Sequence, residues 1–301
     1  MDKLIAQFVH YLSADKNFSE RTIRAYELDL QKFTAFLESR NITDISNVAR
    51  DDIRAFLSEL TLNGIKKPNS AVTRARKLSS IKSFYKYLVR YGVLEANPAA
   101  DVETPKLPHK EPNYLTPEEY DALLLAVRRA ATPFYLARDL AIVTTFLNTG
   151  VRLSELVGLT LHSINLQSSN AFIKVRGKGD KERTIPLNEN VAATLRKYVE
   201  KRPEVDTNQL FISRVGKGLG SRSVYHLIKR YLKEAGIKKE RIGVHSLRHT
   251  FGASLLAKNV NLVVIQELLG HKKLETTRRY LHINSVDLRN AVDRLVLDTQ
   301  P

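Results

Sequence analysis

The most informative stretch of the chain is residues 245–280, which read HSLRHTFGASLLAKNVNLVVIQELLGHKKLETTRRY. Its predicted helix ends and turns carry four chemically active side chains, namely His245, Arg248, His271 and Tyr280. A guanidinium can donate to two phosphate oxygens at once, and imidazoles can donate hydrogen bonds or transfer a proton. A phenol can attack the phosphorus and hold the phosphate covalently, which keeps the bond energy for rejoining. The stretch therefore predicts phosphate-ester chemistry with Tyr280 as the nucleophile, and it predicts that the rest of the chain holds DNA.

Two motifs in this stretch, His-x-x-Arg and Leu-Gly-His with a tyrosine nine residues later, resemble the C-terminal half of the tyrosine recombinase (phage integrase) family. The whole chain is most similar to the small Xer-type members, and Arg152 and Lys178 extend the resemblance upstream. The resemblance implies a site-specific DNA recombinase with six catalytic residues: Arg152, Lys178, His245, Arg248, His271 and Tyr280.

The resemblance also implies what each group does while Tyr280 attacks the phosphate to form a 3′-phosphotyrosine and release a 5′ hydroxyl. Two arginines and a histidine would hold the non-bridging phosphate oxygens, which gives this task to Arg152, Arg248 and His271. His245 would assist proton movement at the phenol. Lys178 would protonate the leaving 5′ oxygen, a task for a flexible donor.

Two of these positions are ambiguous when they are judged by their surroundings in the sequence. Arg152 opens a predicted helix in the segment GVRLSEL, where a salt bridge with Glu155 is as good an interpretation as a ligand contact. The family's Arg-x-x-Glu pattern favours a phosphate clamp that Glu155 orients. Lys178 lies between two glycines of a predicted hairpin, where a solvated tip is the usual outcome, and Lys181 is close enough to be confused with it.

His245 and His249 are four residues apart, a spacing that could also serve a metal. The chain has no cysteine, and no nearby carboxylate completes a histidine-rich ligand set. Two arginines, a lysine and two histidines can neutralise the charge that divalent ions offset in two-metal nucleases. We therefore expect no metal and no cofactor.

Composition predicts two domains and a polyanionic partner. The chain has 301 residues, 43% of them hydrophobic, and a formal net charge of +16. Such a charge favours a nucleic acid or an acidic membrane surface, and it does not by itself choose between them. No run of about 18 apolar residues could span a bilayer, and the N-terminus has no signal-peptide cleavage site. We expect a cytoplasmic, nucleoid-associated protein with double-stranded DNA as its partner and no membrane contact.

The fold expected from the patterns is mainly α-helical with two domains. Residues 1–104 predict four helices, at about 3–13, 19–40, 51–60 and 70–91, which the resemblance identifies as a SAM-like core-binding domain. Four prolines between Asn97 and Pro112 predict a stiff linker at 105–114. Residues 115–301 predict an α+β catalytic domain with a small antiparallel sheet.

Several elements of the second domain have clear local signals. Thr116, Pro117 and Glu119 form a predicted capping box before a helix to about Arg129, and Gly150 closes the next helix. The segments 171–175 and 182–187 predict a hairpin, 189–201 and 221–235 predict helices, and 210–212 is strand-like.

Basic residues on the predicted helices are candidate DNA-backbone contacts, although a charged helix face is often merely solvated. They are Arg74, Lys77, Lys82, Lys86, Arg222 and Lys229.

A last predicted helix, 285–297, carries Leu288, Val292 and Leu295 on one side and needs a groove to dock in. It could dock on its own domain, whereas the resemblance favours docking on a neighbouring protomer. The resemblance also implies a homotetramer on two DNA sites, or a heterotetramer with a paralogous partner, that works through a Holliday junction.

A monomeric type IB topoisomerase-like enzyme and a DNA-binding regulator that never cleaves are the alternatives. The docking helix disfavours the first and the complete catalytic set disfavours the second. The target site, and a role in chromosome-dimer resolution or in mobile-element integration, stay open.

Overall fold

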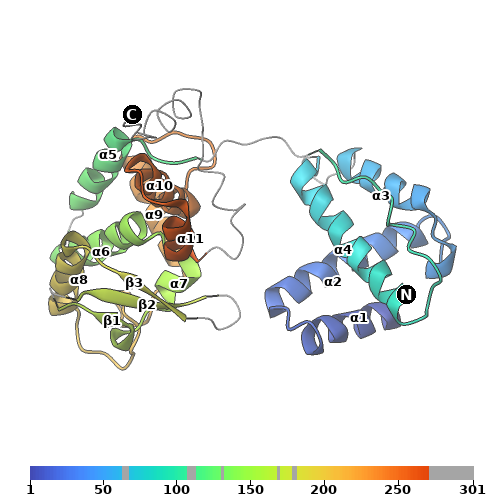
Figure 1. Cartoon of the computed structure of the whole chain (residues 1–301), viewed down its shortest axis with the longest axis horizontal. Coiled ribbons are helices and arrows are strands. Elements are labelled where there is room, and N and C mark those ends of the chain that lie inside the picture. Colours follow the sequence, from blue (N-terminus) through green and yellow to red (C-terminus); the bar gives the residue numbers. More distant parts are fainter. Residues whose placement is uncertain (63–67, 107–112, 130–131, 168–169, 178–181, 271–301) are drawn as a thin grey trace, which may run out of the picture. The chain divides into compact units, whose positions relative to one another are not determined.

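The computed structural model describes residues 1–270 except 63–67, 107–112, 130–131, 168–169 and 178–181 (Figure 1). The described residues form eleven α-helices and a three-stranded sheet. The chain separates into two compact units, residues 1–110 and 111–301, and the division falls within the range predicted as a linker. None of the described helices is long and apolar enough to cross a membrane.

The first unit consists of four α-helices and one short 3-10 turn. They are α1 (Asp2–Ala14), α2 (Glu20–Glu38), the turn Ile45–Asn47, α3 (Arg50–Leu62) and α4 (Ala71–Arg90). Helices α2 and α4 begin at capping serines, because the side chains of Ser19 and Ser70 accept the backbone N–H of Thr22 and Thr73.

The core of this unit is built from the apolar stripes of its helices. The apolar stripe of α4 is fully inside, since Leu78, Ile81, Tyr85 and Leu88 are each at most 1% exposed. Burial raises the pKa of the Tyr85 phenol well above its ordinary value, and the nearby Asp52 adds to this effect. Tyr85 is therefore a packing residue.

The described part of the second unit consists of seven α-helices and a small sheet. Its helices are α5 (Pro117–Arg128), α6 (Pro133–Thr149), α7 (Leu153–Val157), α8 (Glu189–Lys201), α9 (Ser221–Glu234), α10 (Val244–Ala257) and α11 (Leu262–Leu269). Helix α6 is the centre, because it packs against α5, α8 and α10. The capping box of Thr116 and Glu119 is formed as predicted, and Gly150 ends α6 in the left-handed region with φ of 61°.

The sheet has the order β1-β2-β3 and is antiparallel throughout. Strands β2 (Phe172–Arg176) and β3 (Glu182–Pro186) are the predicted hairpin, while the two-residue β1 (Ile164–Asn165) is too short for its sequence to reveal. The strand predicted at 210–212 was wrong. This segment makes one isolated bridge, between Ile212 and Gly218, and its side chains fill the core instead.

Candidate active site

The site begins where α6 ends. After Gly150 the chain runs extended through Arg152, which is the residue that caps the N-terminus of α7. The backbone N–H of Arg152 donates to Oε2 of Glu155 at 2.7 Å, and its guanidinium Nη1 donates to Oε1 of the same carboxylate at 2.6 Å. The predicted salt bridge between Arg152 and Glu155 is therefore made. It leaves the Arg152 side chain 36% exposed, so part of the guanidinium faces solvent.

Glu155 is the buried acceptor at the middle of this site. Its side chain is 1% exposed, and the fork of Arg183 donates to both of its oxygens, at 2.8 Å to Oε1 and 2.9 Å to Oε2. Burial alone would raise the pKa of the Glu155 carboxyl. Hydrogen bonds from Arg183 and Arg152, together with the positive charge of Arg183, outweigh burial and lower that pKa from 4.5 to about 2. Glu155 is thus a carboxylate at neutral pH.

Arg248 reaches the same place from α10. It is 6% exposed, and its Nη1 donates to the carbonyl oxygen of Gly150 at 2.6 Å. Its Nη2 donates to the carbonyl oxygen of Leu269. Arg248 therefore joins the end of α6 to the end of α11, where Leu269 is the neighbour of Gly270, whose carbonyl Arg152 binds.

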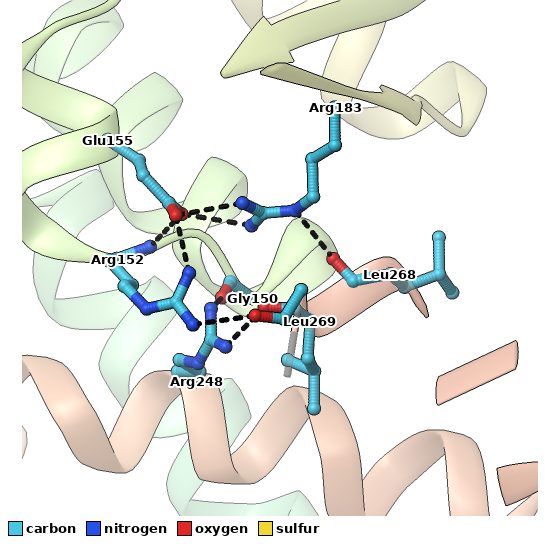
Figure 2. A network of polar contacts seen from close by, with 8 residues as sticks. Gly150, Arg152, Glu155, Arg183, Arg248, Leu268 and Leu269 are labelled. Carbon is cyan, nitrogen blue, oxygen red and sulfur yellow. Dashed lines mark hydrogen bonds and ion pairs between the residues drawn. The ribbon is translucent and has the colours of Figure 1, made fainter. Parts of the chain in front are cut away.

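Three guanidinium groups converge on the last turn of α11, and Figure 2 shows them together. Arg183 Nε donates to the carbonyl of Leu268 at 3.2 Å, Arg248 to that of Leu269, and Arg152 Nη2 to that of Gly270 at 2.9 Å. The final carbonyls of a helix have no partner within the helix and carry the negative end of its dipole, so cations stabilise them. Three arginines are thus bound to the carbonyls of the three residues that directly precede His271.

Comparisons with known proteins agree with this arrangement. The model of the phage integrase family matches residues 113–286, and the family's N-terminal SAM-like domain matches residues 5–92. The chain belongs to the phage integrase family. It is accordingly a tyrosine recombinase, an enzyme that breaks and rejoins DNA strands.

The relatives of this recombinase include tyrosine recombinases of the Xer type. It is 37% identical to the tyrosine recombinase XerC of Thermodesulfovibrio yellowstonii, over 96% of this chain and 93% of the relative. It is 36% identical to XerD of Listeria innocua, over 96% and 97% of the two chains. A crystal structure of the XerH site-specific recombinase bound to difH substrate, a pre-cleavage complex, has a TM-score of 0.73 and 25% identity over 96% of this chain and 84% of that chain.

Of the six predicted catalytic residues of the recombinase, the structure describes Arg152, His245 and Arg248. The two arginines lie together, and His245 is exposed in the first turn of α10, three residues before Arg248. Lys178, His271 and Tyr280 lie outside the described residues, as does the predicted helix 285–297. Among the described residues, no three histidine, aspartate or glutamate side chains gather in a way that could hold a metal ion.

The prediction that Lys77 contacts DNA was wrong. Its side chain is 5% exposed, and its ammonium donates to Oδ1 of the buried Asp29 at 3.0 Å. Arg76 and Ser80 donate to the same carboxylate, so Lys77 belongs to a buried cluster between α2 and α4. A buried, paired ammonium cannot reach a phosphate without breaking this cluster.

The remaining basic candidates differ in how accessible they are. Lys86 and Arg222 are exposed. Lys82 donates to the carbonyl of Ala100 at 3.0 Å, Lys229 donates to the carbonyl of Ile242 at 2.6 Å, and Arg74 donates to the hydroxyl of Thr61. The last three keep their positive charge, but each has at least one donor already directed to its own unit.

Sequence reasoning missed Arg183. A signal was present, because alternation along β3 puts Arg183 on the same face as the buried Ile185, and an arginine that faces a core needs an anionic partner. Glu155 had been assigned to Arg152 alone. The second guanidinium on Glu155 became visible only when the strand and the helix were brought together.

Proposed function

We propose that the arginine cluster at the end of α11 binds the scissile phosphate of DNA, and that Tyr280 attacks it. The observation that carries this proposal is the position of Arg152, which is held by Glu155 on one side and keeps a 36% exposed side chain on the other. A guanidinium fixed in this way can donate to the non-bridging oxygens without reorganising when negative charge develops there. Arg248 and His271 complete the oxygen-binding set.

In the proposed reaction the Tyr280 oxygen forms a bond to phosphorus while the bond from phosphorus to the 5′ oxygen breaks. The phenol gives up its proton with the help of His245, and Lys178 supplies a proton to the departing oxygen. The product is a 3′-phosphotyrosine with a free 5′ hydroxyl. Attack by a 5′ hydroxyl from another strand reverses these bond changes and rejoins the DNA.

The proposed assembly is a tetramer on two DNA sites that exchanges strands through a Holliday junction. The net charge of +16 suits a chain whose two domains both bind the duplex, residues 1–104 as core-binding domain and 115–301 as catalytic domain, with 105–114 as the linker. Lys86 and Arg222 are the exposed candidates for backbone contacts, with Arg74, Lys82 and Lys229 as partly occupied ones. We place the reaction on nucleoid DNA in the cytoplasm.

The proposed docking partner of the predicted helix 285–297 is a cavity of about 500 Å³ on the neighbouring protomer's second unit. Its apolar lining includes Leu115, Leu147, Phe251 and Leu255. Leu288, Val292 and Leu295 of the helix supply apolar side chains of matching character. A helix of this length needs such a groove to be stable, which supports an assembly over a monomeric topoisomerase.

Covalent trapping tests the chemistry. The full chain is incubated in EDTA with duplex DNA nicked next to a candidate site, so that the short released strand diffuses away and rejoining fails. A protein–DNA adduct on a denaturing gel is expected for the wild type and for Tyr114→Phe, a control at a 40% exposed tyrosine, and no adduct for Tyr280→Phe. An adduct that persists in Tyr280→Phe would assign the wrong nucleophile, and DNA binding without any adduct would favour the regulator.

A further inference from the structure

Arg183 is the member of the three-arginine cluster that donates to both oxygens of Glu155 with its guanidinium fork. It lies in β3, with its side chain 14% exposed, compared with 36% for Arg152. All three of its nitrogens donate within the protein, two to Glu155 and one to the carbonyl of Leu268. Each nitrogen of its guanidinium therefore already has an acceptor within the protein.

The fork of Arg183 sets the plane of the Glu155 carboxylate. Two parallel N–H to oxygen bonds fix a carboxylate in one orientation, which a single bond does not. The same two oxygens of Glu155 receive the backbone N–H and Nη1 of Arg152. The direction in which Arg152 points therefore depends on the plane that Arg183 imposes.

Arg183 also fixes the turn that leads to His271. Its Nε holds the Leu268 carbonyl, and a Cβ added to Gly270 would lie 3.2 Å from three atoms of the Arg183 side chain, Cδ, Nε and Cζ. Gly270 has φ of 61° and accepts from Arg152 at 2.9 Å. Arg183 thus touches the turn by a hydrogen bond at one residue and by close packing at another.

We propose that Arg183 is a positioning residue for DNA cleavage, which holds Arg152 through Glu155 and the 268–270 turn through Leu268 in a single arrangement. This inference rests on the proposed function, because it assigns Arg152 to the phosphate. Arg183 does not touch the DNA. Lysine cannot replace it, because an ammonium lacks the planar fork and cannot donate to both oxygens of Glu155 and to Leu268 in the same geometry.

The test separates binding from chemistry with the conservative variant Arg183→Lys in the full chain. We measure the dissociation constant for a nicked duplex and the single-turnover rate of adduct formation at saturating protein. The ammonium keeps a positive charge beside Glu155, so binding is expected to stay within about threefold of the wild type. The cleavage rate is expected to fall by about 10²-fold, the cost of misplacing a catalytic group by about 1 Å.

The matched control is Glu182→Gln at the neighbouring residue of β3. Glu182 pairs with Arg176 at 3.2 Å with both side chains more than half exposed, so its loss should leave the cleavage rate unchanged. Unfolding midpoints are measured for each variant, and rates are compared well below the lowest midpoint. If Arg183→Lys does not fold, the double variant Glu155→Gln/Arg183→Gln, which removes both buried charges, replaces it with the same expected loss.

The outcomes distinguish the inference from the function on which it rests. No adduct with the wild type would overturn the proposed function and this inference with it. An active wild type with Arg183→Lys at the wild-type rate would overturn the inference alone. Equal losses in binding and in cleavage would also overturn it, because Arg183 would then act on the affinity for DNA.

Discussion

Two buried carboxylates, Asp29 in the first unit and Glu155 in the second, each receive hydrogen bonds from two basic side chains. In the first unit, Asp29 of α2 receives Arg76, Lys77 and Ser80, all from α4. In the second unit, Glu155 receives Arg152 from its own helix start and Arg183 from β3. The two clusters have the same chemistry, and they differ in where their contacts lead.

We call the Asp29 cluster closed because its hydrogen bonds join only two helices. We call the Glu155 cluster continuing because its arginines also bind the backbone of a third segment. All donors to Asp29 come from one helix, so the cluster fastens α2 to α4. Both arginines of Glu155 donate further, to the carbonyls of Leu268 and Gly270 next to His271. A buried ion pair is therefore not itself a sign of a functional site. The distinguishing feature is an onward connection to the backbone that carries reactive side chains.

The largest expected effect is on the closed cluster and concerns stability. Asp29→Ala leaves the ammonium of Lys77 buried with no carboxylate, which should cost about 3–5 kcal/mol of unfolding free energy. Urea unfolding of the full chain measures it. The double variant Asp29→Ala/Lys77→Met should regain most of the loss, since it removes the uncompensated charge. If Asp29→Ala lowered the cleavage rate per folded molecule, the Asp29 cluster would affect the reaction as well as stability, and the two clusters would not differ as described.

The next effect is on the continuing cluster and concerns rate. Glu155→Gln keeps the shape of the side chain but can accept through only one oxygen, so Arg152 loses its alignment. We expect the single-turnover rate of adduct formation to fall about 10²-fold. DNA affinity should change far less. Equal rates for Glu155→Gln and the wild type would make the Glu155 cluster merely structural, like that of Asp29.

Acid pH should weaken the second unit through Glu155. Its pKa is lowered from 4.5 to about 2 in the folded protein, so its contribution to stability is complete above pH 4.5 and is lost as the pH falls toward 2. The loss by pH 3 is roughly 2 kcal/mol from this group. Urea unfolding of the wild type and Glu155→Gln at pH 6 and pH 3 isolates it. The wild type should lose more stability than the variant, and parallel losses would contradict the assignment.

The smallest effect is expected at the exposed pair on the same sheet. Arg176 and Glu182 are 67% and 58% exposed, so water screens their attraction. Glu182→Gln should change the unfolding free energy by about 0.5 kcal/mol or less. If Glu182→Gln changed the unfolding free energy as much as Asp29→Ala, burial would not be the property that decides how strongly an ion pair stabilises the fold.

Local signals in the sequence predicted most of the fold. Ser19, Ser70 and the Thr116 capping box mark helix starts because each side chain bonds to its own next turn, and Gly150 marks an end because it adopts φ of 61°. These interactions span a few residues and need no knowledge of the tertiary structure. The predicted helices 189–201 and 221–235 agree with α8 and α9 to within one residue for the same reason.

The failures concern contacts between distant segments. Lys77 was grouped with the exposed basic residues of its helix, although Ser80 and Phe84 on the same side of α4 are buried. Its partner Asp29 is 48 residues away, and no local pattern connects them. The contact between Arg183 and Glu155 was not predicted for the same reason. The two residues are 28 positions apart, and Glu155 already had an obvious partner in Arg152.

The central claim is that Arg152 is held in place to neutralise negative charge on the scissile phosphate. The most direct test compares adduct formation on an ordinary phosphate with formation on a methylphosphonate, in which a neutral methyl group replaces one charged non-bridging oxygen. Arg152→Ala should be slowed about 10³-fold on the phosphate, the cost of removing one preorganised donor, and hardly at all on the methylphosphonate. Equal slowing on both substrates would contradict the account, because Arg152 would then act on something other than the phosphate charge.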